Sequence, residues 1–597
     1  MNLHANPSEP TPAEFFPTDP TGLPDATRPS VVELADGEKL HLRVAPVAKR
    51  LDGTTVRMLG YNGSIPGPTL KVAQGSEVIV HVTNDGDLEG TVHWHGLRLD
   101  NEFDGVPHET QTPIPVGGDF TYRIRFPDPG LYWYHPHIRE DYTQEMGLYG
   151  NILVVPAEEG YWPPAHRDVL LTLDDLLIED GKIAPFSPAE TTYTAMGRFG
   201  NVLLIGGEQD YSLTTKTGEV VRLWLTNTAN TRVFNVRLPR ARMKLVGGDS
   251  GRVEHDEFVS EVILAPSERA VVDVLFDQTG YFELQHRTPD RTYRLATITV
   301  TGESATPSLA GQFEVLRTAP ELAAEREFFA AWLEAPPDKT LALIAEMDDI
   351  TAPGQGPVIY ACPMHPEVTS LEPGRCPQCG MKLLATAVVT VYACPMHPEV
   401  TNDQPGRCPK CGMKLLVTAL AAQPTGREPA AAPHPHGSHE DRGADHGHGD
   451  GHGHGDGGGI EWEDDMVAVN RLTTPANMRW KLVDRSTGAA NAAIDWQFTE
   501  GDRVKIRLVN EMDSDHPMHH PFHLHGAGRF LVLARDGAPE PNLVWKDTVL
   551  VRTGQTVDIL FDVTNPGLWM AHCHIAEHMQ SGMMFSFTVA RKQGAGR

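Results

Sequence analysis

The sequence predicts an all-β protein built from β-sandwich or Greek-key barrel domains. Short β-rich runs of about five to eight residues alternate with turn signals through most of the chain, as in residues 76–85, 219–228 and 501–510. The length of 597 residues is too great for one hydrophobic core. Because the same pattern fills three separate blocks of the chain, we expect three such domains.

An abrupt change of composition at about residue 350 interrupts the third block. Lys339–Met347 alternates like a strand, which predicts that the third domain begins before this change and that residues 350–459 are an insertion in it. Residues 320–335 have apolar side chains about every three to four positions, which predicts a short connecting helix. The predicted parts are a disordered arm at 1–29, a first domain at 30–157, a second at 158–304, a linker at 305–337, a third domain at 338–349 and 460–590, two tandem repeats at 350–420 and a disordered His/Gly-rich linker at 421–459.

The chain is strongly acidic, with 50 Lys and Arg against 79 Asp and Glu and a formal charge of −29. This balance argues against nucleic acid or an anionic membrane as the main partner. No run of residues approaches the roughly eighteen apolar residues of a membrane span. The N-terminus has no basic region followed by an apolar one, so we expect a cytoplasmic protein, or a periplasmic or secreted one if the chain is a processed form.

One short stretch of the third domain gathers three imidazoles, a thiol and a thioether: His572, Cys573, His574, His578 and Met583. On an extended strand successive side chains point to opposite faces, so Cys573 faces one way and its two flanking histidines face the other. By the same alternation, His520 faces one side of its strand, and His523 and His525 face the other. One face then collects the ligand types of a blue-copper electron-transfer site, namely His520, Cys573, His578 and Met583.

The opposite face collects only imidazoles. The third domain contributes His523, His525, His572 and His574, and the first domain adds two same-face pairs in His93-Trp94-His95-Gly96 and His135-Pro136-His137. Eight imidazoles that converge between two domains can hold three copper ions, with open positions where dioxygen could bind. The second domain has neither paired histidines nor cysteine, so we expect it to be architectural.

The four motifs HWHG, HPH, HPFHLHG and HCHIAEHMQSGMM resemble, in this order, the copper motifs of the three-domain multicopper oxidases, the laccase and copper oxidase family. The resemblance covers roughly residues 31–304 and 460–590 and implies cupredoxin-like domains. It also implies one-electron oxidation of a substrate at type 1 copper. Electrons would then pass through Cys573 to its flanking histidines, and four of them would reduce O₂ to two waters.

The resemblance further implies a ligand set for four copper ions. The type 1 ligands would be His520, Cys573, His578 and Met583; the type 2 ligands His93 and His523; and the type 3 ligands His95, His135, His137, His525, His572 and His574. Asp104 matches the position of an acidic proton donor in relatives, and an ordinary turn aspartate is the alternative. In several bacterial relatives a Glu follows the last type 1 histidine. Here that position is Met579, so a role of Glu577 in a second proton route stays open. His516 and His519 precede the type 1 motif and are expected to be loop histidines.

Two near-identical units follow each other at a period of 32 residues, from Tyr360 and from Tyr392. Each has Cys-x-x-His followed by Cys-x-x-Cys: Cys362, His365, Cys376 and Cys379, then Cys394, His397, Cys408 and Cys411. Units of this kind, too small to fold by core burial alone, resemble zinc-ribbon-like modules and the short heavy-metal-binding domains of metal transport proteins. Zn(II) and Cu(I) both fit each module, and disulfide bonding is the alternative. The His-rich tract after them is either a weak metal-capturing segment or a plain linker.

The insertion leaves two functions open. One is an oxidase of phenols (laccase-like), of metal ions such as Cu(I), or of both. The other is a metal-ion oxidase or sequestration protein in copper or heavy-metal resistance, with little phenol oxidase activity. In both cases we expect O₂ and a small phenolic or metal-ion reductant as partners.

Overall fold

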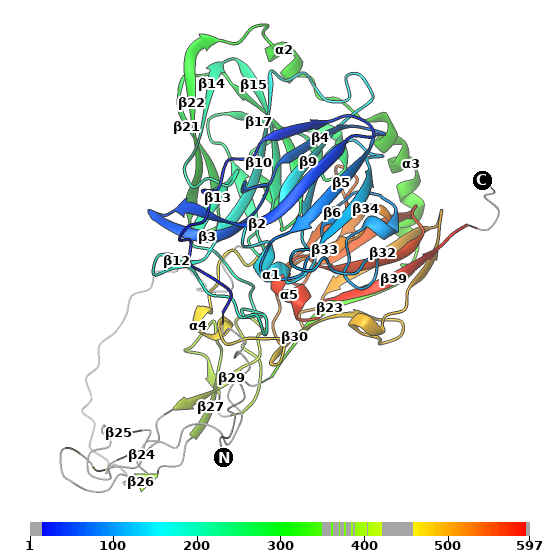
Figure 1. Cartoon of the computed structure of the whole chain (residues 1–597). Helices are drawn as coiled ribbons and strands as arrows, with labels where there is room; N and C mark the ends of the chain where they lie inside the picture. The colour runs from blue at the N-terminus through cyan, green and yellow to red at the C-terminus, as the bar shows by residue number, and fades with distance from the viewer. Residues whose placement is uncertain are drawn as a thin grey trace, which may run out of the picture. The chain divides into compact units, whose positions relative to one another are not determined.

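The computed structural model describes residues 15–348 and 458–592, together with 389–402, 404–420 and a few short stretches between residues 360 and 385. The chain divides into two compact units (Figure 1). One comprises residues 1–346 and 457–597 and holds three β-domains; the other comprises residues 347–456 and holds the inserted repeats. The all-β fold class predicted from the sequence is confirmed, because each of the three β-domains is built on two large β-sheets, to which the second domain adds the two-stranded sheet β11-β12.

The first domain pairs a four-stranded sheet, in the order β3-β2-β5-β7, with a five-stranded sheet, in the order β1-β4-β9-β8-β6. Buried and half-buried residues alternate along β5, so one face of that strand is apolar and packs into the core between the sheets. The strands are β1 Val31–Leu34, β2 Lys39–Leu51, β3 Thr54–Tyr61, β4 Thr69–Ala73, β5 Glu77–Asn84, β6 His93–His95, β7 Asp119–Arg125, β8 Gly130–His135 and β9 Gly150–Val155.

Residues 15–29 differ from the expected disordered arm, of which residues 1–14 lie outside the described residues. The ring of Phe16 stacks on that of Tyr142 with centroids 3.9 Å apart. The Thr27 N–H donates to the Gly63 carbonyl at 2.9 Å. The stacked ring of Phe16 and backbone hydrogen bonds such as that of Thr27 hold the segment against the domain, which its Pro- and Thr-rich composition does not predict.

The second domain has a six-stranded sheet, in the order β13-β10-β15-β20-β17-β18, and a five-stranded sheet, in the order β14-β22-β21-β16-β19, around its own apolar core. Its strands are β10 Arg167–Leu176, β11 Ile178–Glu179, β12 Lys182–Ile183, β13 Val202–Ile205, β14 Tyr211–Thr217, β15 Glu219–Asn227, β16 Phe234–Arg237, β17 Arg242–Gly248, β18 Gly251–Val259, β19 Val262–Leu264, β20 Arg269–Phe276, β21 Gly280–Arg287 and β22 Thr292–Ser304. Helices α2 Ala310–Phe313 and α3 Pro320–Glu334 follow, α3 where the sequence predicts a helix.

The third domain has a six-stranded sheet, in the order β30-β23-β32-β37-β34-β35, and a five-stranded sheet, in the order β31-β39-β38-β33-β36. Leu322 and Phe329 of α3 pack on this domain against Leu531 and Leu560. Its strands are β23 Lys339–Met347, β30 Met478–Asp484, β31 Gln497–Thr499, β32 Arg503–Asn510, β33 His520–Leu524, β34 Gly528–Arg535, β35 Ala538–Pro539, β36 Thr548–Val551, β37 Thr556–Val563, β38 Gly567–Cys573 and β39 Met584–Ala590. Strands β23 and β30 are neighbours in one sheet although the insertion separates them in sequence.

Two short helices form a contact between the first domain and the third. Helix α1 Glu140–Thr143 packs against α5 Ala576–Gln580, so the segments that follow His137 and His574 lie side by side (Figure 1). The remaining short helices are η1 Asn101–Phe103, α4 Val467–Asn470 and η2 Asn491–Ala493. Among the residues that the structure describes, none of the helices has the length and apolarity that crossing a lipid bilayer requires.

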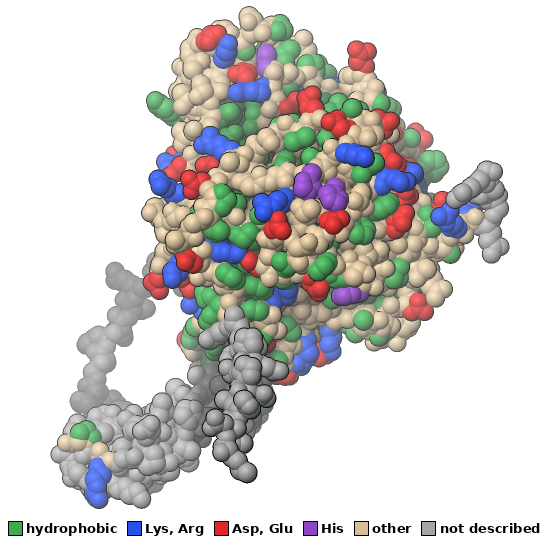
Figure 2. All heavy atoms as spheres, in the orientation of Figure 1, with side chains coloured by type: hydrophobic (Ala, Val, Ile, Leu, Met, Phe, Trp, Pro, Cys, Tyr) green, Lys and Arg blue, Asp and Glu red, His purple; other side chains and the backbone are tan. Residues whose placement is uncertain are grey.

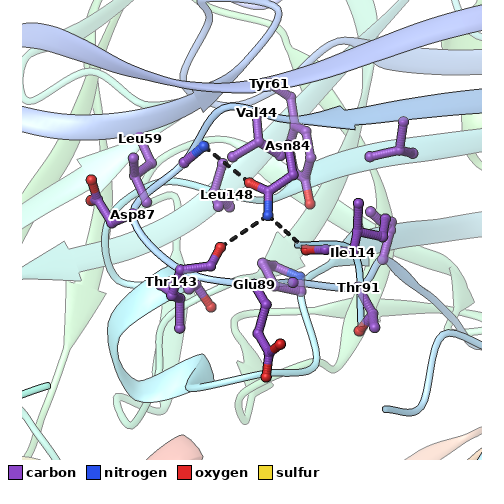
Figure 3. Close-up of a pocket in the computed structure, with 16 residues that line it drawn as sticks. Val44, Leu59, Tyr61, Asn84, Asp87, Glu89, Thr91, Ile114, Thr143 and Leu148 are labelled. Carbon is purple, nitrogen blue, oxygen red and sulfur yellow. Dashed lines mark hydrogen bonds between the residues drawn. The ribbon is translucent and has the colours of Figure 1, made fainter. Parts of the chain in front are cut away.

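The turn between β5 and β6 is fixed by Asn84, which lines a small cavity in the first domain (Figure 3). Its side-chain amide donates to the carbonyls of Leu88 and Ile114, at 2.9 Å each, and its oxygen accepts from the Gly86 N–H at 3.0 Å. Because these polar atoms are satisfied within the protein, we interpret this cavity as part of the scaffold that leads into β6 and its histidines.

The inserted unit contains two three-stranded sheets, in the orders β25-β24-β26 and β28-β27-β29. Their strands are β24 Tyr360–Ala361, β25 Thr369–Ser370, β26 Leu384–Ala385, β27 Val389–Ala393, β28 Thr401–Asn402 and β29 Leu416–Leu420. The four predicted ligands of the first repeat, Cys362, His365, Cys376 and Cys379, lie outside the described residues, as do residues 421–457 of the His-rich tract.

Candidate metal centres

The paired strands bring the predicted histidines together two by two. In the first domain β6 runs antiparallel to β8, which sets His93 opposite His135. In the third domain β33 runs antiparallel to β38, which sets His523 opposite His572 and Phe522 opposite Cys573. All eight predicted cluster histidines are buried, and the most exposed, His137, is only 4% exposed. On the face that Figure 2 shows, charged side chains of both signs are mixed and few histidines reach the surface.

We call these eight residues the histidine cluster. Their ring nitrogens include three groups of three, each with the atoms within 4.8 Å of one another, and the first two groups share His95. The groups are His93, His95 and His523; His95, His135 and His574; and His137, His525 and His572. Each group combines residues of the first and third domains, so the cluster lies between these two domains.

The hydrogen bonds of the cluster leave one nitrogen of each ring free to bind a metal. The Nδ1 atoms of His93, His135 and His523 donate to the backbone carbonyls of Asp104, Pro136 and Asp547, at 2.7 to 2.9 Å. Their Nε2 atoms are buried and have no hydrogen-bond partner among the described residues. His525 and His572 donate through Nδ1 to Asp104 and to the Cys573 carbonyl, which leaves their Nε2 atoms facing each other at 3.0 Å. Two nitrogens that both lack a proton repel unless they share a cation, so the donor set fits bound metal ions.

Burial sets the protonation of these rings. It lowers the pKa of His95, His135, His137, His523, His525 and His574 well below the usual value, and lowers that of His572 to about 4. These seven imidazoles are therefore neutral at pH 7, which is the form that binds transition metals.

A separate group lies on the other face of β38. The Cys573 Sγ lies 3.5 Å from the His520 Nδ1 and 3.7 Å from the His578 Nδ1, and the two Nδ1 atoms are 3.3 Å apart. We call these three residues the sulfur site. Burial raises the pKa of the Cys573 thiol, so a positive ion is needed to hold it as a thiolate. Met583 is fully buried, and its carbonyl accepts from the Cys573 N–H at 3.1 Å, which holds its backbone beside the site.

The two acidic residues singled out in the sequence lie in different places. Asp104 directly follows η1 and touches the histidine cluster: its Oδ2 accepts from the His525 Nδ1 at 2.8 Å, and its Oδ1 lies 3.3 Å from the His93 Nδ1. Glu577 is buried and accepts from the Thr231 hydroxyl of the second domain at 3.2 Å. Burial raises the pKa of Glu577 to about 8. Asp104 is therefore the acid in contact with cluster imidazoles, whereas Glu577 is tied to a neighbouring domain.

The two loop histidines are also buried. His516 and His519 lie just before β33, and the His519 Nδ1 accepts from the Glu461 N–H at 3.1 Å. Burial lowers the pKa of His519 to about 3 and that of His516 to about 4, so both are neutral.

Three residues that contact the metal-site histidines carry no motif in the sequence. Glu140 lies 3.3 Å from the His137 Nδ1. Its carboxylate is buried, and burial raises its pKa well above the usual value. Asp547 accepts from the His95 Nε2 at 2.9 Å. The Trp480 ring stacks on that of His578 with centroids 4.0 Å apart. Only Glu140 lies close to its histidine in the sequence, three residues after His137.

The second repeat brings its four predicted ligands together. Cys394, His397, Cys408 and Cys411 have their ligand atoms within 4.8 Å of one another. The Cys394 Sγ lies 3.5 Å from the Cys411 Sγ and 3.7 Å from the His397 Nδ1. A hydrogen bond from the Cys411 thiol lowers the pKa of Cys394, so one thiolate is favoured even without a metal. Tetrahedral Zn(II) with bonds of about 2.3 Å to sulfur would set sulfur atoms about 3.8 Å apart, close to this geometry.

A β-sandwich fold with a His₂Cys site beside an all-histidine cluster is characteristic of copper-binding β-sandwich proteins. Residues 44–159 and 464–593 match models of the multicopper oxidase family, and residues 359–386 and 391–416 match the heavy metal binding domain. The chain is thus identified as a multicopper oxidase family protein with inserted heavy metal binding domains, and the family implies bound copper ions.

The relatives that the chain resembles are multicopper oxidases and laccases. Multicopper oxidase MmcO of Mycobacterium tuberculosis is 30% identical over 299 residues, which cover 44% of this chain and 57% of that protein. Laccase-3 of Oryza sativa is 25% identical over 94% of both chains. The solved multicopper oxidase from Campylobacter jejuni, a metallo-oxidase, has a TM-score of 0.58 over 97% of this chain and 99% of that chain at 19% identity, which shows a shared fold. The chain spans about half the length of the first curated relatives it matches.

Proposed function

We propose that this protein is an oxidase that couples one-electron oxidation of a reductant to the four-electron reduction of O₂ to water. The observation that carries this proposal is the end of β38, where Cys573 belongs to the sulfur site while His572 and His574 belong to the histidine cluster. One residue of backbone therefore joins the two groups, and a covalent path of this kind suits electron transfer between them.

We assign the sulfur site, with Met583, to type 1 copper. His93 and His523 would hold type 2 copper, and the other six cluster histidines would hold the type 3 pair. The two separate groups of three histidines that exclude His93 support this division. Copper ions bound there supply one-electron redox chemistry and the open positions at which O₂ reacts.

The chain itself orients the ligands, excludes water and holds protons. Seven of the cluster imidazoles have an oxygen of the protein within 3.3 Å of the ring nitrogen that does not face the metal, which fixes their orientation. We infer that the Asp104 carboxylate relays protons through Oδ1, which is buried and has no hydrogen-bond partner among the described residues. From there the proton lies beside two cluster imidazoles, where oxygen reduction would consume it.

Oxygen consumption by the copper-loaded protein tests the proposal. With a phenol or Cu(I) as reductant, we expect turnover that requires copper and stops at two molecules of water per O₂, without released peroxide. A protein that binds its full complement of copper and consumes no O₂ with either reductant would refute it.

A second candidate function is the handling of metal ions by the insertion, as in oxidation or sequestration of Cu(I) or heavy metals. The four converging ligands of the second repeat favour it. We expect Cys408→Ser to weaken metal binding by that repeat and to slow turnover of Cu(I) more than turnover of a phenol. Lys410→Gln is the matched control, because Lys410 is a neighbouring side chain paired with Glu399 rather than with a thiol. Equal effects on both substrates would argue against a role of the repeat in delivering Cu(I).

A further inference from the structure

The second domain, which the sequence predicts to be architectural, sends one residue into the histidine cluster. Arg269 begins β20, and its side chain is fully buried. The Nε atom donates to the Leu131 carbonyl of the first domain at 3.0 Å. The Nη1 and Nη2 atoms donate to Oδ1 and Oδ2 of Asp547 in the third domain, at 2.7 and 2.5 Å. One guanidinium therefore joins all three domains.

Every N–H of this guanidinium has an acceptor. The two that remain after Leu131 and Asp547 donate to the carbonyls of Ser267 and Asp249, at 2.9 and 3.2 Å. Burial on its own would lower the pKa of Arg269, but the Asp547 and Asp249 carboxylates raise it above its ordinary value, so the group is permanently charged. A lysine has three donors on one nitrogen and cannot reproduce this planar arrangement of five.

The partner of Arg269 sets the orientation of two cluster imidazoles. The Asp547 Oδ1 accepts from the His95 Nε2 at 2.9 Å, and the Asp547 backbone carbonyl accepts from the His523 Nδ1 at 2.9 Å. With its Nε2 held by this bond, His95 is left with Nδ1 free, whereas His93, His135 and His523 have Nε2 free. The carboxylate thus selects an exceptional tautomer at one ring of the cluster.

An independent observation shows that the chain is built around this ion pair. Gly96, the last residue of the His93-Trp94-His95-Gly96 motif, has a φ of +84°. A Cβ at this position would lie 2.5 Å from the Asp547 Oδ2 and 2.8 Å from the Arg269 Nη2. The backbone next to His95 therefore passes directly over the ion pair, and only glycine leaves room for it.

We propose that Arg269 is a positioning residue for the histidine cluster: by clamping the Asp547 carboxylate it holds His95 with Nε2 protonated and Nδ1 directed at the metal position. This role rests on the proposed function of the cluster in binding copper. It makes the second domain a part of the metal centre, because without it the carboxylate that orients His95 would lose both of the hydrogen bonds that Arg269 donates to it.

The variants Arg269→Lys and Arg269→Gln test the role, with Arg222→Lys as the matched control. Arg222 lies on β15 of the same domain, is also buried and pairs with both oxygens of Asp273, at 2.7 and 3.0 Å, yet contacts no cluster residue. We expect both Arg269 variants to keep the blue absorption of the sulfur site and to lose copper from the cluster, with affinity there reduced about 10- to 100-fold. The type 2 electron paramagnetic resonance signal should change as well. The control should load copper as the wild type does.

A measurement on the copper-free protein separates this role from the proposed function. ¹⁵N resonances of the histidine rings report which nitrogen carries the proton, and we expect His95 protonated at Nε2 in the wild type and a mixture of tautomers in Arg269→Gln. Unchanged tautomers, or an unaltered type 2 signal at full copper content, would overturn the proposal. If both variants fail to fold, Asp547→Asn decides in the same two assays. A wild type that binds no copper would count against the proposed function alone, since the tautomer result would still stand.

Discussion

Replacing Asp104 with Asn should slow the reaction with O₂ while leaving the sulfur site intact. The Asp104 carboxylate accepts from the His525 Nδ1 at 2.8 Å, and its other oxygen lies 3.3 Å from the His93 Nδ1. An Asn can still accept from His525 through its oxygen, but its NH₂ group then faces a ring nitrogen that is itself a donor. The variant thus loses the charge of one hydrogen bond and the proton relay that we assign to Oδ1.

The magnitude follows from the kind of bond that is lost. A hydrogen bond to a charged group contributes about 1.5–3 kcal/mol, and one between neutral groups about 0.5–1.5 kcal/mol. The difference of about 1–2 kcal/mol corresponds to roughly a 5- to 30-fold effect. Loss of the proton relay adds to it, because general acid catalysis contributes about 100-fold or more. We therefore expect the slowing to exceed about 100-fold.

Stopped-flow mixing of the reduced protein with O₂ measures this rate directly, and the blue absorption monitors the sulfur site in the same sample. Asp128→Asn is the control, because Asp128 is a partly buried carboxylate of the same domain that pairs with Arg98 and Arg529 instead of with histidine. Reoxidation of Asp104→Asn at the wild-type rate would remove Asp104 from the reaction.

Three further predictions concern other parts of the molecule. Cys573→Ser should abolish the blue absorption and O₂ consumption but leave copper in the histidine cluster, as metal analysis would show; an active variant would exclude a path through the thiol. Gly105→Ala should destabilise the protein by more than about 2 kcal/mol in urea unfolding, because Gly105 has a φ of +84° and a Cβ there would collide with the Val92 carbonyl oxygen; a stability within experimental error of wild type would contradict this. Burial lowers the pKa of His286 from 6.5 to about 3, so the unfolded chain binds a proton between these values that the folded chain does not, and stability rises with pH across this window. Between pH 6.5 and 4.5 this one group should cost about 2 kcal/mol, and His286→Gln should lose that part of the pH dependence in urea unfolding; identical slopes for both proteins would show that His286 is not responsible.

The fold class and the two groups of metal-site residues could be predicted because both depend on local patterns. Alternation along β5 and along β33 fixes which side chains share a face, and strand parity alone separates Cys573 from His572 and His574. The order of the four motifs along the chain then indicates that histidines of the first domain pair with histidines of the third domain.

The residues that orient the cluster could not be predicted from the sequence. Arg269 and Asp547 are 278 positions apart, and Asp547 and His95 are 452 positions apart. No local spacing distinguishes Arg269 from the other arginines on strands of the second domain, since its role arises only where three domains meet. The expectation for residues 15–29 differs from the structure because the average composition of a Pro- and Thr-rich segment gives no weight to one ring, that of Phe16, which stacks on Tyr142.

The division of the histidine cluster between the first and third domains sets an order in time. A ribosome adds about 5–20 residues per second, so His574 is made roughly half a minute to a minute and a half after His93. During that interval the first domain can fold while only its own four histidines of the eight-residue cluster have been made. Both thiol repeats, at residues 350–420, are synthesised before the last half of the cluster. The cysteines of the repeats therefore leave the ribosome before the histidine cluster can be completed.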